Sequence, residues 1–232
     1  MKAFLLAAGQ GTRLKPLTDN LPKCLVPIAG KPMLQIWFEI CRSAGITEVL
    51  INLHAHAEQV RDFVARNAHD LKVTLSEEPE LLGSAGTLQA NRQWLGEDPE
   101  FWVLYSDVLT SLSFRNMLAQ HRQKGSKATL GVYHVDQPNR CGIVTTNGDR
   151  RITAFVEKPQ NPISNLAFAG IMVASAEICG LIPCDKTAPD IGYDLLPRLV
   201  GQMHAYPIGE FLIDIGTRQT YERAQREWPG IA

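Results

Sequence analysis

The feature that most limits how this chain can fold is an alternation of apolar runs and helical patterns through its first half. Each apolar run is short, and each segment between runs repeats apolar residues every three or four positions. Continuous apolar strands separated by helices are typical of a parallel sheet covered by helices on both faces. The pattern predicts strands over 3–8, 48–52, 72–77, 101–106 and 127–135, and helices over 32–45, 57–68, 85–95 and 112–125.

The pattern changes after Cys141. Residues 141–157 predict a β-hairpin turning at Asn147-Gly148, because Asn-Gly is the strongest short hairpin signal. A further strand over 165–175 and a last helix over 216–228 follow. The second half is therefore expected to add antiparallel strands to a mixed, mainly parallel sheet.

The sequence has 232 residues and contains no linker, repeat or low-complexity segment. This length allows one large domain or two small ones and can bury a sizeable core. We expect one α/β domain over 1–232, with about 1–135 and about 136–232 as its halves. Ligands of open parallel sheets bind beyond the carboxyl ends of the strands. The loop that follows the first strand is therefore the first place to look for a site.

Composition limits the partners. The net charge is −1 and no run of basic residues occurs, which argues against nucleic acid. No apolar stretch approaches the roughly 20 residues of a membrane-spanning helix, and the N-terminal run is too short for a signal peptide. The five cysteines are odd in number and scattered, which indicates free thiols and predicts a reducing, cytoplasmic location.

The loop after the first strand, "AAGQGTR", places Gly9 and Gly11 before Arg13, and Lys23 follows ten residues later. Glycines let backbone amides converge on phosphate oxygens, and an arginine and a lysine beside them suit a polyphosphate. The loop is neither a Walker loop, since GK[ST] is missing, nor a dinucleotide fingerprint, since a third glycine is missing. Turn glycines in a solvated surface loop would have the same composition.

Two aspartates end apolar strands at opposite ends of the chain. Asp107 follows "VLYS", and Asp214 lies in "FLIDIGT" just before a helix that Thr217 would cap. Carboxylates at such positions can bind a metal ion or can complement a helix N-terminus. Two carboxylates with substrate phosphates suit Mg²⁺, whereas the dispersed histidines and cysteines do not suit zinc.

Two further segments have features of binding sites. Gly83 and Gly86 flank a helix start in "EEPELLGSAGTL", where amides and the helix dipole favour an electron-rich group. Glu157 and Lys158 end a strand before a proline. A glycine-containing helix entry and a solvated strand edge explain these features equally well without a ligand.

The stretch "LAAGQGTRLKPLTDNLPKCLVPIAGKPML" closely resembles the opening signature of the sugar-1-phosphate nucleotidyltransferases, also called nucleotide-sugar pyrophosphorylases. The resemblance extends over essentially the whole chain and implies a GT-A-like, Rossmann-like fold with a small antiparallel region on the sugar side. It also implies catalysis by charge neutralisation at phosphates. Ser106 departs from the family pattern, in which a glycine usually precedes the aspartate, and could crowd the pocket.

The resemblance assigns roles to individual residues. The implied catalytic residues are Arg13, Lys23 and Lys158, and Asp107 and Asp214 would bind Mg²⁺. The implied nucleotide-binding residues are Leu6, Ala7, Ala8, Gly9, Gly11, Thr12, Glu78, Gly83, Ser84 and Gly86. The implied sugar-binding residues are Gly142, Glu157, Asn165 and Gly170.

The form "EPELLGSAG" is most similar to the mannose-1-phosphate and heptose-1-phosphate guanylyltransferase branch, which favours GTP and a manno-configured sugar 1-phosphate. A chain this short also resembles uridylyl- and thymidylyltransferases for other sugars, such as N-acetylmuramic acid 1-phosphate. A non-catalytic regulator with the same fold would have lost a metal carboxylate or the signature lysine, and both are present. The acidic residue that binds the ribose in dinucleotide-dependent oxidoreductases is missing at the corresponding place in this sequence, which argues against that class. A homodimer is left open, because no pattern encodes an oligomeric state.

Overall fold

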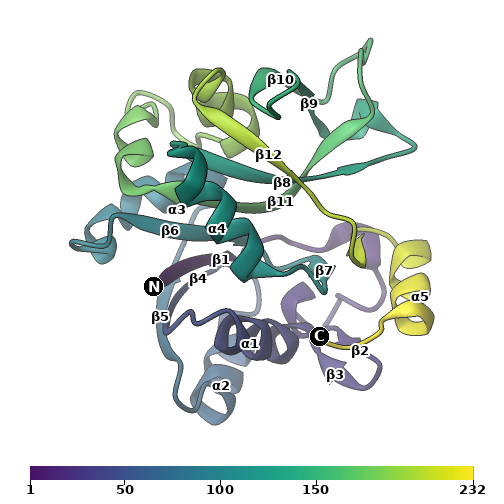
Figure 1. The fold of residues 1–232 in the computed structure, drawn as a ribbon. Helices are drawn as coiled ribbons and strands as arrows, with labels where there is room; N and C mark the ends of the chain where they lie inside the picture. The colour runs from purple at the N-terminus through teal and green to yellow at the C-terminus, as the bar shows by residue number, and fades with distance from the viewer. Residues whose placement is uncertain (232) are drawn as a thin grey trace. The chain divides into compact units, whose positions relative to one another are not determined.

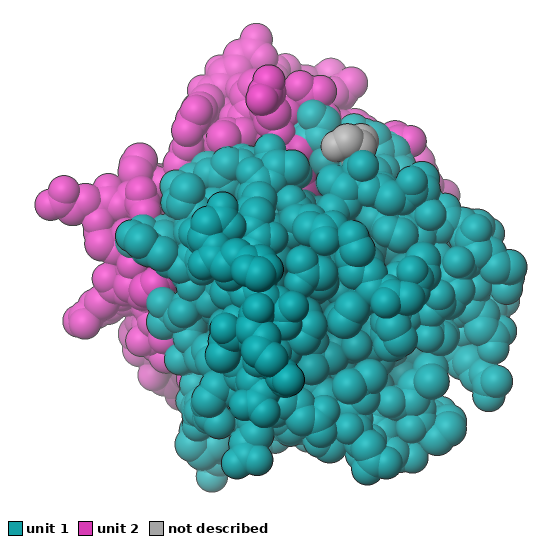
Figure 2. Space-filling view, turned by 90° about the horizontal axis from the view of Figure 1, so that it is seen from below, with its two compact units in different colours: residues 1–81, 104–113, 210–232 teal, residues 82–103, 114–209 magenta. Residues whose placement is uncertain are grey.

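A computed structural model describes residues 1–231. The described chain separates into two compact units, which Figure 2 colours differently. Unit 1 contains residues 1–81, 104–113 and 210–231, and unit 2 contains residues 82–103 and 114–209. Each unit is thus assembled from segments that are distant in the sequence.

Unit 1 is built on three parallel strands, β1 (Lys2–Leu6), β4 (Glu48–Leu53) and β5 (Lys72–Glu77). β4 pairs with both of the others, so that Phe4 lies opposite Leu50 and Leu50 lies opposite Thr74. All residues of β4 after Glu48 are buried, as expected for the middle strand of a parallel sheet.

The helices of unit 1 are α1 (Met33–Ser43), α2 (Ala57–Asn67) and α5 (Arg218–Glu227). In Figure 1, α1 and α2 lie below β1, β4 and β5. α1 buries an apolar stripe that includes Trp37 and Phe38, each of which contributes about 1.5–3 kcal/mol by leaving water. The chain leaves α1 through Gly45, whose φ of 71° suits glycine because it has no Cβ.

Two short antiparallel pairs complete unit 1. β2 (Pro27–Ile28) pairs with β3 (Lys31–Pro32), and β7 (Val108–Thr110) pairs with β13 (Leu212–Asp214). α5 is attached to β2 through Gln225, which accepts a hydrogen bond from the Ala29 amide at 2.8 Å and donates one to the Pro27 carbonyl at 2.5 Å. The C-terminal helix therefore belongs to unit 1, although residues 114–209, which precede it, belong to unit 2.

Unit 2 contains β8 (Ala128–His134), β9 (Gly142–Thr146), β10 (Ile152–Glu157), β11 (Leu166–Ser175) and β12 (Met203–Pro207). β11 is antiparallel to β8 and β9, β10 is antiparallel to β9, and β12 is parallel to β8. β6 (Glu100–Tyr105) runs from unit 2 into unit 1. Residues 100–103 of this strand belong to unit 2 and residues 104–105 to unit 1.

The helices of unit 2 are α3 (Ser84–Ala90) and α4 (Phe114–Lys124). Short helical segments form several connections: η1 (Thr12–Leu14) and η2 (Lys23–Leu25) in unit 1, and η3 (Arg92–Leu95), η4 (Pro138–Arg140), η5 (Ala176–Leu181), η6 (Ile191–Leu195) and η7 (Leu196–Leu199) in unit 2. η6 is a π-helical turn, a conformation that occurs often at functional sites.

The predicted α/β class is confirmed, and all five predicted helices are present. The predicted hairpin is present as β9 and β10, where the Asn147 side chain accepts hydrogen bonds from the amides of Asp149 and Arg151. β12 and the turn η6 were not predicted. No helix within residues 1–231 is long and apolar enough to cross a membrane.

Candidate active site

Four charged side chains predicted as site residues lie in unit 1. Arg13 is in η1, Lys23 begins η2, Asp107 lies between β6 and β7, and Asp214 ends β13. The ammonium group of Lys23 lies 2.5 Å from the Asp107 carboxylate, and the lysine side chain is only 11% exposed. An ion pair so well shielded from water is held more firmly than a pair on an open surface.

The pairing of β7 with β13 brings the two aspartates together. Asp214 is opposite Val108, the residue after Asp107, and the Ile215 amide donates a hydrogen bond to the Asp107 carbonyl at 2.8 Å. The short β ladder thus holds two carboxylates that are more than 100 residues apart in the sequence.

The environment raises the pKa of Asp214 to about 6. The largest cause is the surrounding protein, which disfavours the charged form of the carboxyl group although the residue as a whole is exposed. Repulsion from Asp107 adds to this effect, whereas the charges of Lys23 and Arg13 act against it. Because Asp214 has a raised pKa and a second carboxylate beside it, additional positive charge at this position is stabilising.

Gly216 makes room for this cluster. A Cβ atom at this position would lie 2.6 Å from Asp214 Oδ1 and 3.1 Å from Arg13 Nη2, well inside normal contact distances. The glycine of "DIGT" therefore allows the arginine and the aspartate both to approach its backbone.

The predicted phosphate loop follows β1 directly. The amides of Ala7 and Ala8 both donate to Asn52 Oδ1, at 2.7 and 3.3 Å. Gly11 has a φ of 63°, and Thr18 donates a hydrogen bond to its carbonyl at 2.8 Å. The first two amides of the loop are therefore engaged by the protein itself, and Gly9 and the residues after it remain as candidates for phosphate contacts.

Glu78 supports this loop from within unit 1. It is 3% exposed, and its carboxylate accepts a hydrogen bond from Asn52 Nδ2 at 2.9 Å. Asn52, which the sequence analysis did not select, thus connects Glu78 to the end of β1. A polar residue near the end of the apolar run "EVLIN" was a signal that could have identified it.

Ser106 is also buried in unit 1. Its amide donates to the Leu6 carbonyl at 3.0 Å, and its carbonyl accepts from Trp37 Nε1 at 3.2 Å. The backbone of Ser106 therefore fixes the start of the Asp107 segment against the end of β1.

In unit 2, Gly83 and Gly86 pack against the segment Ala188–Pro189. A Cβ at Gly83 would lie 2.5 Å from the Pro189 carbonyl oxygen, which accepts hydrogen bonds from the amides of Ala85 and Gly86. The expectation of open amides at this helix start is wrong for these two groups, because the protein's own chain supplies their acceptor. The glycines allow the close approach of that chain.

Gly142, Glu157 and Lys158 also come together in unit 2. Glu157 lies opposite Gly142 in the β9–β10 ladder, and a Cβ at Gly142 would lie 2.6 Å from Glu157 Oε2. Lys158 has a φ of 47°, and its ammonium lies 3.6 Å from Glu157 Oε1 and 5.7 Å from the centre of the Tyr193 ring.

Burial raises the pKa of Glu157. The positive charge of Lys158 lowers it, and the negative charge of Asp190 raises it further. Asp190 was not selected from the sequence, nor was Gly192, where a Cβ would lie 2.3 Å from Glu157 Oε2. These residues belong to the segment "PDIGYD", which has no periodic pattern and gave no signal.

The other two predicted sugar-side residues have structural partners. Asn165 Oδ1 lies 2.9 Å from His134 Nδ1, and the Asn165 carbonyl accepts from the Val135 amide. Gly170 has a φ of 72° and lies where the register of β11 shifts between Phe168 and Met172. Gly170 thus supplies the backbone conformation of a β-bulge.

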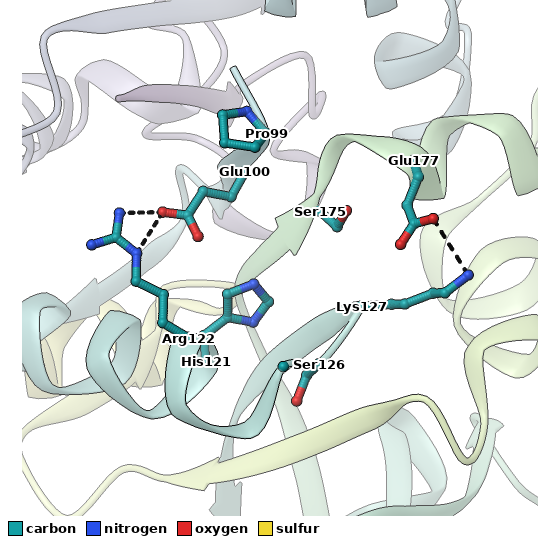
Figure 3. Close-up of a pocket in the computed structure, with 9 residues that line it drawn as sticks. Pro99, Glu100, His121, Arg122, Ser126, Lys127, Ser175 and Glu177 are labelled. Atoms are coloured by element: carbon teal, nitrogen blue, oxygen red, sulfur yellow. Dashed lines mark hydrogen bonds and ion pairs between the residues drawn. The ribbon is translucent and has the colours of Figure 1, made fainter. Parts of the chain in front are cut away.

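A charged pocket of about 370 Å³ lies elsewhere in unit 2 (Figure 3). Its walls contain two ion pairs, Arg122 with Glu100 and Lys127 with Glu177. None of the predicted site residues lines this pocket, and its charges neutralise one another. Within residues 1–231, no group of three or more histidine, cysteine or acidic residues is arranged to hold a metal ion.

Comparisons with known proteins show which family the chain resembles. Residues 2–229 match the family described as Nucleotidyl transferase. The mannose-1-phosphate guanylyltransferase catalytic subunit beta of Danio rerio is 37% identical over 222 residues, which cover 93% of this chain and 61% of that protein. Mannose-1-phosphate guanylyltransferase 1 of Arabidopsis thaliana is 33% identical, with 95% and 63% covered.

This chain thus spans less than two thirds of the length of these relatives. Among solved structures, HddC from Yersinia pseudotuberculosis complexed with GMP-PN has a TM-score of 0.81 and is 26% identical, with 98% of this chain and 99% of that chain covered. By its match to the family along nearly its whole length, the chain belongs to the nucleotidyl transferase family.

Proposed function

We propose that this protein transfers a nucleotidyl group from a nucleoside triphosphate, most favourably GTP, to a sugar 1-phosphate, giving a nucleoside diphosphate sugar and pyrophosphate. The observation that carries the proposal is the gathering of Arg13, Lys23, Asp107 and Asp214 within unit 1. Two cations and two carboxylates suit a reaction between two phosphates.

In this reaction an oxygen of the sugar phosphate attacks the α-phosphorus, and the bond from that phosphorus to the leaving pyrophosphate breaks. The attacking phosphate is already ionised at neutral pH, so no general base is required. Because both reactants are anions, catalysis depends on positioning and on neutralisation of charge. Arg13 would neutralise the leaving phosphates, Lys23 the charge around the α-phosphate, and Lys158 the attacking phosphate.

Asp107 and Asp214 would hold a divalent cation, which we propose to be Mg²⁺. Their oxygen donors suit Mg²⁺, and the raised pKa of Asp214 indicates that positive charge is stabilising between the two carboxylates. When bound, such an ion supplies a counter-charge for phosphate oxygens. Because the Lys23 ammonium lies beside the Asp107 carboxylate, we infer that both groups would act on the same phosphate.

The triphosphate would be surrounded by Leu6, Thr12 and the glycines of the loop, and the base would contact Gly83–Gly86. The sugar side would be formed by Glu157, Gly142, Asn165 and Gly170. GTP is favoured by the segment "EPELLGSAG" and by relatives named mannose-1-phosphate guanylyltransferase. A manno-configured hexose or heptose 1-phosphate is the favoured acceptor. We further propose action in the cytoplasm, in keeping with five cysteines that are not joined in disulfides, and leave a homodimer as the assembly to be tested.

The test is a matrix of four nucleoside triphosphates against several sugar 1-phosphates, measured by pyrophosphate release with mass spectrometry of the product. We expect the highest turnover with GTP and mannose 1-phosphate or a manno-configured heptose 1-phosphate. Efficient use of UTP or dTTP without turnover of GTP would replace the guanylyl assignment by the uridylyl or thymidylyl alternative. Absence of turnover with every pair would contradict the proposed function.

A further inference from the structure

The carboxylate of Asp190 makes hydrogen bonds to two different segments of unit 2. Its Oδ1 atom accepts from the amides of Gly192 and Tyr193 at 2.8 and 3.1 Å, which caps the turn η6. Its Oδ2 atom accepts from the Ser84 hydroxyl at 2.8 Å, and Ser84 is the first residue of α3. One side chain therefore joins η6 to the start of α3.

The backbone around Asp190 reinforces the same connection. Ser84 Oγ accepts a hydrogen bond from the Ile191 amide at 2.8 Å, and the Pro189 carbonyl accepts from two amides of α3. The Asp190 amide in turn donates to Asp194 Oδ2 at 2.7 Å. The segment 189–194, which we call the Asp190 turn, and the first residues of α3 are thus one hydrogen-bonded assembly.

The Asp190 turn also sets the surroundings of Glu157. Gly192 approaches so closely that a Cβ there would lie 2.3 Å from Glu157 Oε2 and 3.2 Å from Asp190 Oδ1. Tyr193, whose ring lies near the Lys158 ammonium, takes its backbone position from the same carboxylate. A shift of the Asp190 turn would therefore move Gly192, which lies against Glu157, and Tyr193, whose ring lies near Lys158.

We propose that Asp190 is a positioning residue that couples the segment Gly83–Gly86, assigned above to the base, to the Glu157–Lys158 pair, assigned to the sugar phosphate. This inference rests on the proposed function. Asp190 does not itself need to touch a substrate, because it acts through the α3 start on one side and through Gly192 and Tyr193 on the other. Both substrates would then be oriented by one partly buried hydrogen-bond network.

The kinetic test compares Asp190→Ala with Asp190→Asn, using GTP and mannose 1-phosphate. Asparagine keeps an acceptor for the two amides and can donate to Ser84 Oγ, so it should retain kcat/KM within about 3-fold, whereas alanine leaves several polar groups unpaired. We expect Asp190→Ala to lower kcat/KM roughly 10- to 100-fold, mainly through a higher KM for the sugar phosphate. Asp185→Ala, which removes an exposed aspartate nearby, is the matched control and should match wild type.

Ser84→Ala tests the coupling itself. It should raise mainly the KM for GTP, and its effect should not add to that of Asp190→Ala, because both substitutions break the same link. Full additivity in the double variant, or equal kinetics of Asp190→Ala and wild type, would overturn the inference while leaving the proposed function intact.

Amide hydrogen exchange without substrates separates the two proposals. Ser84→Ala should accelerate exchange at Gly192 and Tyr193, and Asp190→Ala should accelerate it at Ala85 and Gly86. If the wild type turned over no substrate but the two variants showed this reciprocal acceleration of exchange, the proposed function would fail and the structural coupling would stand. If exchange stayed local to each substitution, the coupling would fail whatever the activity.

Discussion

At the scale of single residues, the site depends on close approaches that particular glycines permit. Gly216 admits Arg13 and Asp214, and Gly142 and Gly192 admit Glu157. These approaches could not be predicted from the sequence, because each joins segments that are far apart along the chain. The residue types at the strand ends did predict part of the site, because Asp107 and Asp214 were selected as site residues on that ground and lie in one cluster.

Gly216→Ala should reduce activity more than stability. The added methyl group must displace the Asp214 carboxylate or the Arg13 guanidinium, so we expect kcat/KM to fall at least about 10-fold, since a misplaced group costs that much or more. Gly180→Ala is the control, because a Cβ at Gly180 meets nothing within 4 Å. Steady-state kinetics and thermal unfolding of both variants would separate a loss of activity from a loss of stability. Equal activity of the two variants would show that the close approach has no functional role.

Asp190→Asn should change the pH dependence of the reaction. Asp190 raises the pKa of Glu157, so removal of its charge lowers that pKa while the hydrogen bonds remain. If ionised Glu157 accepts hydrogen bonds from the sugar, the acidic limb of kcat/KM for the sugar phosphate should move to lower pH. The measurement is the pH profile from 4 to 8 of both proteins, and an acidic limb that stays in place or moves upward would refute this role of Glu157.

At the scale of helices and strands, periodicity predicted most of the fold. The apolar runs are found in β1, β4, β5, β6 and β8, and the amphipathic patterns are found in α1, α2, α4 and α5. The turn η6 was missed because "DIGYDLL" has no regular period and is fixed by contacts with Ser84, more than 100 residues away. Tertiary contacts, and not local propensity, define this element.

The cap of α5 can be tested by its stability. Thr217 Oγ1 accepts from the Thr220 amide at 3.2 Å, and Thr220 Oγ1 accepts from the Thr217 amide at 3.1 Å, which together form a capping box. Thr217→Ala should lower the free energy of unfolding by about 1 kcal/mol and the Tm by about 2–4 °C. Thr187→Ala at an exposed position is the control. Calorimetry that found no difference between the two would show that the box does not stabilise the helix.

At the scale of the whole molecule, each unit is formed by segments that are far apart in the sequence. Unit 1 takes residues 104–113 and 210–231 as well as the N-terminal part, and these segments bring Asp107 and Asp214 to Arg13 and Lys23. The sequence predicted one domain with two consecutive halves. It could not indicate that each unit contains segments from both halves, because hydrophobic patterns show which elements form but not which of them pack together. Independent folding as one domain stays a prediction.

The burial of the cysteines provides a probe of the whole fold. Burial raises the pKa of Cys24 and Cys41 to about 12 and that of Cys179 to about 11, so these thiols should be unreactive in the folded protein. Cys184 is exposed and Cys141 is half-buried. A thiol-reactive dye should therefore label Cys184 fastest and all five thiols after denaturation. Cys184→Ser should remove the fast phase, and rapid labelling of Cys24 or Cys41 would contradict the described core.

The central claim is that the charged cluster of unit 1 neutralises phosphate during nucleotidyl transfer, and the turnover of Lys23→Ala tests it most directly. Lys31→Ala is the matched control, because Lys31 also pairs with a carboxylate, Glu39, but lies outside the cluster. With GTP and mannose 1-phosphate, we predict that Lys23→Ala lowers kcat by about 10²–10³-fold while Lys31→Ala stays near wild type. Unchanged turnover of a folded Lys23→Ala protein would contradict the account.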